Sequence, residues 1–223
     1  GYHGFEVDLR MTADGELVVT HDSTLERTTN GKGIVEKTTA AELRKLRTKK
    51  GNKLIFLDEL LEFLKPIKGL YVEFEMKTSP VEYYPEERLK EYCDKLYSAV
   101  MAARPDDAEY VFTSSDYRGL RYLQQIHPGV DLLMITSKPC NAETIDLALA
   151  LGIKRIGCTM DGTSRQAVKK AHDKGLIVSL WPGYSPDDFM LGAYLGADFM
   201  CTDIPVQLKK FQTEKAPWLK VIY

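Results

Sequence analysis

Short apolar runs alternate with amphipathic segments along most of this chain, and that alternation constrains the fold more than any other feature. Strand–helix alternation at this spacing is typical of a parallel sheet with crossover helices. The expected strands cover residues 70–76, 110–113, 131–135, 154–158, 176–181 and 198–202. The expected helices that follow them cover residues 86–103, 117–126, 142–151, 164–174, 186–195 and 205–212. Two earlier helices are expected, one capped by Thr38 or Thr39 and ending near Leu46, and one over Leu57 to Leu64.

The N-terminal segment has a different pattern. Apolar and charged residues alternate from Phe5 to Arg10, which predicts a strand. Residues two apart share one face of a strand, so Glu6 and Asp8 project together. Asp14-Gly15 predicts a hairpin turn, after which residues 17–19 return as a second strand. A turn this short cannot join parallel strands, so the second strand is antiparallel to the first and carries His21 back toward the carboxylates.

A second set of charges lies on the strand over residues 70–76. Glu73, Glu75 and Lys77 share one face of an otherwise apolar strand, which indicates a wet, charged cavity at the strand end. Together with Glu6 and Asp8, Glu75 would complete an all-oxygen site that suits Ca²⁺ or Mg²⁺ and is poor for Zn²⁺. Lys77 would remain as a cation for an anionic substrate. Two alternatives stay open at this point, because paired acids on a strand are often simply solvated and Glu73 could be only an ion-pair partner.

Several motifs along the chain form a recognisable series. They are Glu6-x-Asp8, Thr12-x-Asp14-Gly15, Val19-x-His21-Asp22, Leu25-x-Arg27-Thr28-Thr29, Gly31-x-Gly33, Glu75-Met76-Lys77, Ser114-Ser115-Asp116, Trp181 and Thr202-Asp203-Ile204-Pro205. In this order they resemble the glycerophosphodiester phosphodiesterase family over nearly the whole chain. The resemblance implies hydrolysis of glycerophosphodiesters to glycerol 3-phosphate and an alcohol.

The resemblance also implies roles for individual residues. Glu6, Asp8 and Glu75 would hold one divalent cation, Ca²⁺ or Mg²⁺, against a phosphodiester oxygen. His21 would act as general acid or base, and Lys77 would act in catalysis by binding a phosphate oxygen. Two further residues are expected to contact substrate. These are Trp181, which could instead pack at the barrel mouth, and Ser114, which could instead cap the following helix, as could Asp203.

One part of the family pattern is missing. The family begins with a His-Arg-Gly strand and a following helix, and the first of its two proton-transferring histidines belongs to that strand. We therefore expect a single-domain (β/α)₈ barrel over residues 1–223 that lacks its first βα unit and has an antiparallel hairpin strand inserted after barrel strand 2. His3 does not replace the missing histidine, because it lies about 10 Å back along the strand and on the opposite face. His127 and His172 are expected at the surface.

Composition restricts the partners. The net charge of −2 gives no reason to expect binding to nucleic acid, and no apolar run approaches the roughly 18 residues needed to span a membrane. Four scattered cysteines favour a reducing, cytoplasmic compartment, although a periplasmic or secreted location stays open. We expect a small-molecule substrate and leave the oligomeric state open. The aromatic segment over residues 82–85 could line the site or lead into a helix.

Two alternative functions remain at this stage. One is a catalytically silent barrel that binds an anion or a phosphodiester, because the first histidine of the family pattern is missing. The other is a lipid-acting relative of the phospholipase D type, which would favour an apolar rim around the site.

Overall fold

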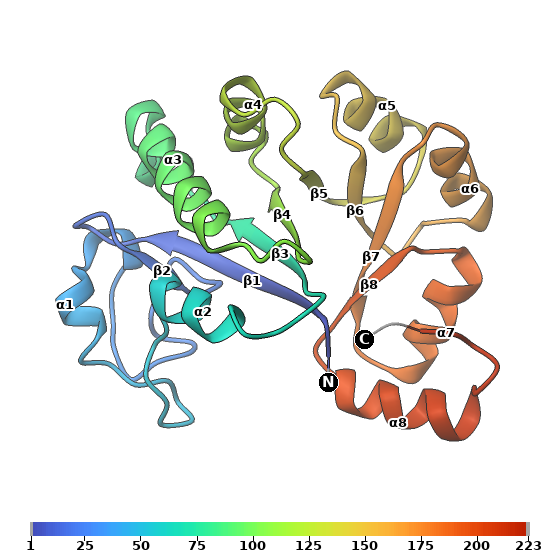
Figure 1. Ribbon diagram of the computed structural model, residues 1–223, viewed down its shortest axis with the longest axis horizontal. Coiled ribbons are helices and arrows are strands. Elements are labelled where there is room, and N and C mark those ends of the chain that lie inside the picture. The colour runs from blue at the N-terminus through green and yellow to red at the C-terminus, as the bar shows by residue number, and fades with distance from the viewer. Residues whose placement is uncertain (1, 222–223) are drawn as a thin grey trace. The chain divides into compact units, whose positions relative to one another are not determined.

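The computed structural model describes residues 2–221 and divides the chain into two compact units (Figure 1). The first unit covers Phe5–Asp131, and the second covers residues 2–4 and 132–221. Each unit contains four adjacent strands, and apart from the β1–β2 hairpin of the first unit these strands alternate with helices along the chain. The predicted α/β class is therefore confirmed.

The sheet of the first unit has the strand order β2-β1-β3-β4. The four strands are β1 (Gly4–Met11), β2 (Leu17–Val19), β3 (Tyr71–Met76) and β4 (Glu109–Ser114). Leu9 pairs with Val19 in an antiparallel register, whereas Glu75 pairs with Thr113 in a parallel one. The antiparallel hairpin predicted from the Asp14-Gly15 turn is thus confirmed, and Gly15 has the positive φ of 85° that such a turn requires.

The helices of the first unit are α1 (Ala40–Leu43), α2 (Leu57–Leu64), α3 (Glu86–Ala103) and α4 (Tyr117–Ile126). Thr39 caps α1 in a capping box with Glu42, as expected, but the helix ends at Leu43 rather than near Leu46. The chain after α1 forms isolated bridges, among them one between Arg47 and Lys53, so those residues contribute to a folded loop instead of extending the helix. The unit also contains two short 3₁₀ helices, Val35–Lys37 and Val81–Tyr83.

A small apolar cluster supports the long segment between β2 and α2, which carries His21. Its buried members are Val18, Leu25, Val35, Ala40, Leu43, Leu54 and Phe56, and Leu46 packs against them. Burying a side chain of the Val, Leu or Phe type stabilises a fold by about 1.5–3 kcal/mol. The cluster therefore fixes this segment against the edge of the sheet despite its small amount of regular secondary structure.

The second unit has the strand order β5-β6-β7-β8, and each neighbouring pair is parallel. Its strands are β5 (Leu132–Pro139), β6 (Arg155–Thr159), β7 (Ile177–Gly183) and β8 (Phe199–Thr202). Its helices are α5 (Ala142–Ala150), α6 (Arg165–Asp173), α7 (Pro186–Leu195) and α8 (Pro205–Lys215). Strand β5 runs four residues beyond its predicted end at Ile135, because its last residues are extended but not buried and leave no apolar signal.

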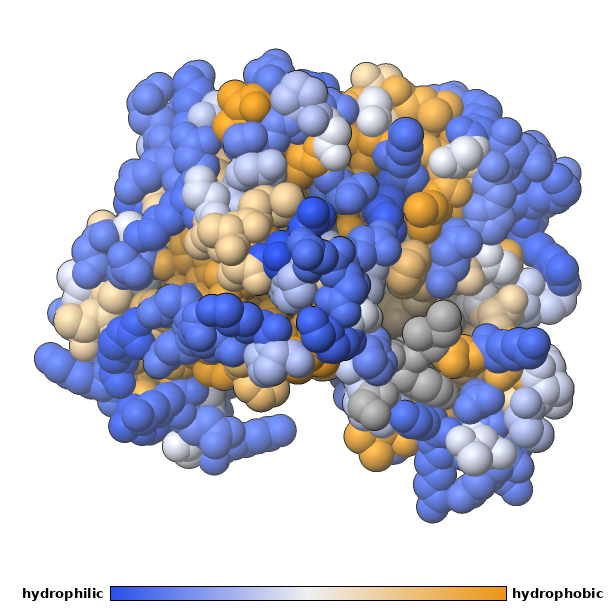
Figure 2. Space-filling view, in the orientation of Figure 1, coloured by the Kyte–Doolittle hydropathy of each residue, from blue (hydrophilic) through white to orange (hydrophobic). Residues whose placement is uncertain are grey.

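Hydrophilic residues cover much of the surface seen in Figure 2, and hydrophobic residues appear in smaller groups among them. Across residues 2–221, no helix is both long enough and apolar enough to cross a bilayer.

Candidate active site

Three carboxylates from neighbouring strands of the first unit converge. Glu6 and Asp8 project from β1 and Glu75 from β3, and one oxygen of each carboxylate lies within 4.8 Å of the others. The convergence follows from the alternation of side chains along a strand together with the adjacency of β1 and β3 in the sheet. All three side chains are half-buried.

Lys77 follows β3 directly and reaches into this group. Its Nζ donates to Oε1 of Glu75 at 2.8 Å and lies 3.3 Å from Oδ1 of Asp8. The ammonium neutralises part of the local charge, but three carboxylates still outnumber one lysine.

The site therefore favours additional positive charge. Burial, followed by repulsion from Asp8 and Glu75, raises the pKa of Glu6 to about 9. Burial also raises the pKa of Glu75, although Lys77 opposes the shift. Burial lowers the pKa of Lys77, but the carboxylates of Glu75 and Asp8 outweigh it, so that pKa is raised overall. A cation bound among the three carboxylates would lower the raised pKa values of Glu6, Glu75 and Lys77.

The donor set suits a hard divalent cation. Oε1 of Glu6 is buried and has no hydrogen-bond partner within residues 2–221, so it is left for a ligand that the protein itself does not supply. A set of carboxylate oxygens without nitrogen or sulfur is the type that holds Ca²⁺ or Mg²⁺. These three residues could therefore hold a metal ion.

Glu73 lies one step further back on the same face of β3. It is buried, and its Oε1 accepts a hydrogen bond of 2.6 Å from the Tyr71 hydroxyl. Glu73 thus hydrogen-bonds to Tyr71 and is not one of the three residues that form the candidate cation site.

His21 lies just after β2 on an exposed segment, with 59 % of its side chain accessible. Its Nδ1 is 2.7 Å from Oδ1 of Asp22, and Arg27 binds both oxygens of that carboxylate. The hydrogen bonds from Arg27 hold the pKa of Asp22 well below its usual range. A carboxylate fixed in this way orients the imidazole and leaves Nε2 as the ring nitrogen available for proton exchange.

A buried ion pair underlies both His21 and Lys77, and the sequence analysis did not identify it. Arg10 donates from Nε to the His21 carbonyl at 2.9 Å and from Nη1 to Glu36 at 2.7 Å. The same Nη1 lies 3.3 Å from the Lys77 carbonyl and 2.8 Å from that of Ser79. In the sequence, Arg10 follows Glu6 and Asp8 at the same spacing of two residues, and this pattern could have pointed to Arg10 as part of the site.

Tyr84 joins the same network from the aromatic segment before α3. Its side chain is fully buried, and its hydroxyl donates to Oε1 of Glu36 at 3.2 Å while accepting from the Met11 amide. Burial, followed by the negative charge of Glu36, raises the pKa of Tyr84 far above its usual value. Tyr84 thus lies buried just before α3, which agrees with a lead-in to the helix rather than with a position at the rim of the site.

Ser114 ends β4 and is fully buried. Its hydroxyl donates to the Met76 carbonyl at 2.8 Å and accepts from the Asp116 amide at 3.0 Å. Asp116, in turn, is the residue that caps α4. The hydroxyl of Ser114 is thus engaged on both sides, and the predicted contact with substrate gains no support from this arrangement.

Two of the predicted residues belong to the second unit. Trp181 lies on β7 and is half-buried, and its Nε1 is enclosed without a hydrogen-bond partner within residues 2–221. Asp203 follows β8 and is exposed. The contact of Trp181 with substrate stays a prediction.

The other histidines have structural contacts. The ring of His127 stacks on that of Tyr97 with 3.5 Å between centroids, and Nε2 of His172 lies 2.9 Å from Asp198. His3 is exposed and precedes the charged part of β1.

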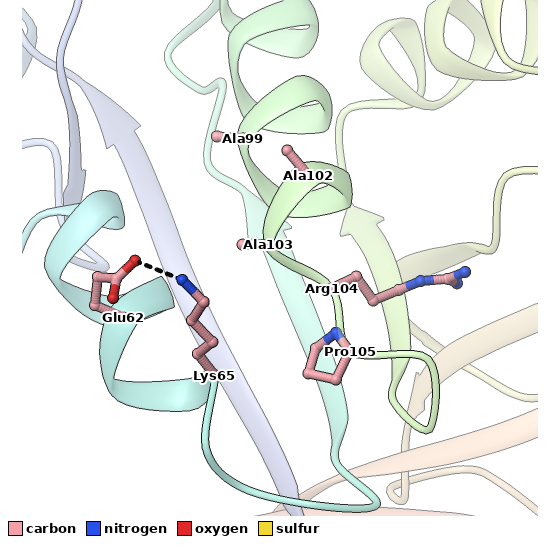
Figure 3. Close-up of a pocket in the computed structure, with 7 residues that line it drawn as sticks. All are labelled: Glu62, Lys65, Ala99, Ala102, Ala103, Arg104 and Pro105. Carbon is pink, nitrogen blue, oxygen red and sulfur yellow. Dashed lines mark hydrogen bonds and ion pairs between the residues drawn. The ribbon is translucent and has the colours of Figure 1, made fainter.

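Two cavities of the first unit differ in chemistry. The larger, of about 450 Å³, lies between α2 and the end of α3, where alanines and the Glu62–Lys65 ion pair line it (Figure 3). It has no histidine and no cluster of acids. The smaller, of about 380 Å³, is bordered by Arg10, His21 and Asp22, and therefore lies next to the proton-transfer candidate.

Solved structures confirm the predicted (β/α)₈-type fold class. A protein from Silicibacter pomeroyi described as a putative glycerophosphoryl diester phosphodiesterase superposes with a TM-score of 0.85 at 22 % identity, covering 95 % of this chain and 83 % of that one. A phosphodiesterase from Oleispira antarctica, solved in complex with the product sn-glycerol-3-phosphate, gives a TM-score of 0.82 at 21 % identity, covering 92 % and 83 %.

Comparison of amino-acid sequences identifies the family. A glycerophosphodiester phosphodiesterase from Bacillus altitudinis is 27 % identical over 230 residues, which cover 96 % of this chain and 88 % of that protein. A glycerophosphodiester phosphodiesterase from Caldanaerobacter subterraneus is 39 % identical over 139 residues, which cover 59 % of this chain and 54 % of that protein. The model of the Glycerophosphoryl diester phosphodiesterase family matches residues 1–207. The chain therefore belongs to the glycerophosphoryl diester phosphodiesterase family.

Proposed function

We propose that this protein hydrolyses glycerophosphodiesters to glycerol 3-phosphate and an alcohol. The observation that carries the proposal is the convergence of Glu6, Asp8 and Glu75 around Lys77, with His21 on the neighbouring segment. Family membership supports the same reaction, as does the product bound in the Oleispira antarctica structure.

The three carboxylates would hold one divalent cation, either Ca²⁺ or Mg²⁺. When bound, such an ion supplies positive charge that polarises a phosphodiester and offsets the charge developing on its oxygens. Oε1 of Glu6 supports this assignment, because it is buried without a partner within residues 2–221. The protein supplies the remaining elements of the reaction from its own side chains.

Lys77 would bind a phosphate oxygen as a point charge. Its ammonium contacts Glu75 and Asp8, and it would therefore lie beside a phosphate whose oxygen binds the cation held by these carboxylates. Burial lowers the pKa of Lys77, but Glu75 and Asp8 raise it by more, so the site favours the charged ammonium. A phosphate oxygen would thus meet a positively charged donor.

His21 would exchange the proton of the reaction as a general acid or base. In hydrolysis, the oxygen of a water molecule loses a proton and forms a bond to phosphorus, while the bond from phosphorus to the leaving oxygen breaks and that oxygen gains a proton. Asp22 occupies Nδ1 of the imidazole, so Nε2 is the atom that we assign to this transfer.

The test is release of glycerol 3-phosphate from glycerophosphocholine, glycerophosphoethanolamine and glycerophosphoinositol with Ca²⁺, Mg²⁺ or EDTA. The proposal expects metal-dependent release that EDTA abolishes. Tight binding of substrate without any release would contradict it and would instead favour the catalytically silent barrel. Release from phospholipid vesicles, but from none of the three water-soluble diesters, would favour a lipid-acting enzyme.

A further inference from the structure

The cavity of about 380 Å³ beside His21 has a largely polar lining. Its walls are Arg10, His21, Asp22, Ser23, Thr24, Ser79 and Pro80. Three of these residues carry a hydroxyl, and the hydroxyls of Ser23, Thr24 and Ser79 make no hydrogen bond within residues 2–221. The lining thus offers several polar groups that can both donate and accept.

Arg10 contributes a fourth group. Its side chain is only 5 % exposed, and its Nε and Nη1 are fully engaged by the His21 carbonyl, Glu36, and the carbonyls of Lys77 and Ser79. Nη2 makes no hydrogen bond within residues 2–221. Since Arg10 lines the cavity, Nη2 is the guanidinium nitrogen left to donate to a ligand there.

The charge of the lining is already balanced. Glu36 neutralises Arg10, with 2.7 Å between Oε1 and Nη1, and Arg27 binds both oxygens of Asp22. A free phosphate therefore gains little net attraction from Arg10. A ligand with an ammonium group likewise gains little from Asp22, because Arg27 already binds both oxygens of that carboxylate. This balance favours a neutral ligand that forms hydrogen bonds.

The lining also lacks the groups that bind quaternary ammonium. Choline is recognised through the faces of aromatic rings, and no Phe, Tyr or Trp of the described chain borders this cavity. Hydroxyl groups of a ligand, by contrast, can form hydrogen bonds with the side chains of Ser23, Thr24 and Ser79 and with Nη2 of Arg10.

We propose that this cavity is the subsite for the leaving alcohol and that it takes a polyhydroxylated alcohol, such as inositol or glycerol, in preference to choline. The inference rests on the proposed function, because it is His21 at the edge of the cavity that would pass a proton to the leaving oxygen. Hydroxyls of the alcohol then bond to the side chains of Ser23 and Thr24 and to Nη2 of Arg10, which holds the leaving oxygen beside the imidazole.

The test compares two substrates in three proteins. The wild type, the double variant Ser23→Ala/Thr24→Val and the control Ser98→Ala would each hydrolyse glycerophosphoinositol and glycerophosphocholine, with kcat/KM measured for both. Ser98 is an exposed residue on α3 and removes an equivalent hydroxyl outside the cavity. The wild type should prefer the inositol substrate, and two lost hydrogen bonds should reduce that preference by about tenfold. Ser98→Ala should retain the wild-type preference.

Two kinetic results would overturn the inference. One is an unchanged preference in the double variant, and the other is an equal loss of kcat/KM for both substrates, which would place the hydroxyls against the glycerol moiety common to the two.

A second readout is independent of turnover. Saturation-transfer NMR in EDTA would follow myo-inositol and choline as probes of the cavity in the same three proteins. The inference expects a signal for myo-inositol that weakens in the double variant and persists in Ser98→Ala. If neither diester is hydrolysed but this pattern appears, the proposed function fails, and with it the role of the cavity in catalysis, while binding of a polyhydroxylated alcohol in the cavity stands. Equal myo-inositol signals in the three proteins would overturn the subsite.

Discussion

Arg10 and Glu36 form a buried ion pair, with 2.7 Å between Nη1 and Oε1 and side chains that are 5 % and 1 % exposed. The two residues are 26 positions apart and connect β1 to the 3₁₀ helix Val35–Lys37. Through the carbonyls of His21 and Lys77, the pair also contacts the backbone of both residues that we assign to proton transfer and phosphate binding.

Removing one partner of this pair should destabilise the protein strongly. Arg10→Met leaves the Glu36 carboxylate buried and uncompensated, and breaking a buried pair in this way costs about 3–5 kcal/mol. The double variant Arg10→Met/Glu36→Leu should regain much of that loss, because it removes both buried charges. Urea denaturation of the two variants and the wild type would measure the free energies of unfolding. A double variant less stable than Arg10→Met would contradict the account.

Glu75→Gln should weaken cation binding while the fold is retained. The substitution keeps the size of the side chain but removes one of three negative charges around the candidate ion, and each carboxylate is a ligand in the proposed set. We expect the Kd for Ca²⁺ or Mg²⁺, measured by calorimetry, to rise by about tenfold or more. Glu91→Gln on α3, at an exposed acid, is the matched control and should bind as the wild type does. Equal affinities in all three proteins would remove Glu75 from the site.

Asp22→Asn should lower kcat with little change in KM. The amide keeps the shape of the side chain but can present either its nitrogen or its oxygen to Nδ1 of His21. It would therefore no longer fix one orientation of the imidazole ring. We expect a fall in kcat of about tenfold to a hundredfold. Arg27→Met, which removes the clamp on Asp22, should show a smaller fall in the same direction. An unchanged kcat in Asp22→Asn would show that Asp22 does not position the imidazole.

Tyr84 should make the protein sensitive to alkaline pH. Its pKa is raised in the folded state by burial, so its contribution to stability is complete below the pKa of an unfolded tyrosine, near 10, and is lost as the pH rises above that value. One such group adds a slope of at most about 1.4 kcal/mol per pH unit to the free energy of unfolding. Between about pH 9.5 and 11 the free energy of unfolding should therefore fall more steeply in the wild type than in Tyr84→Phe. Parallel curves for the two proteins would exclude this role.

Local signals in the sequence were sufficient for most elements of the fold. Helices α2, α4 and α7 have their predicted bounds, and α7 shows why, since Pro186 and Gly196 mark its start and its end. The group formed by Glu6, Asp8 and Glu75 was also predictable. Side chains alternate between the two faces along each strand, and β1 lies next to β3 in the sheet.

The remaining features depend on tertiary contacts. Nothing in the local sequence pairs Arg10 with Glu36, which is distant along the chain and lies in a segment with little regular structure. The engagement of the Ser114 hydroxyl by the Met76 carbonyl is likewise a contact between strands rather than a local preference. The extension of β5 to Pro139 could not be predicted either, because apolar patterning reports burial and those residues are not buried.

We propose that the carboxylates of β1 and β3 support metal-dependent hydrolysis. The most direct measurement titrates Ca²⁺ or Mg²⁺ into EDTA-treated wild type and Glu75→Gln and follows glycerol 3-phosphate release from glycerophosphoinositol. Release by the wild type should rise and saturate with the cation, and the curve for Glu75→Gln should be displaced to a cation concentration at least about tenfold higher. Release that is equal in EDTA and in saturating cation, or identical curves for the two proteins, would contradict it.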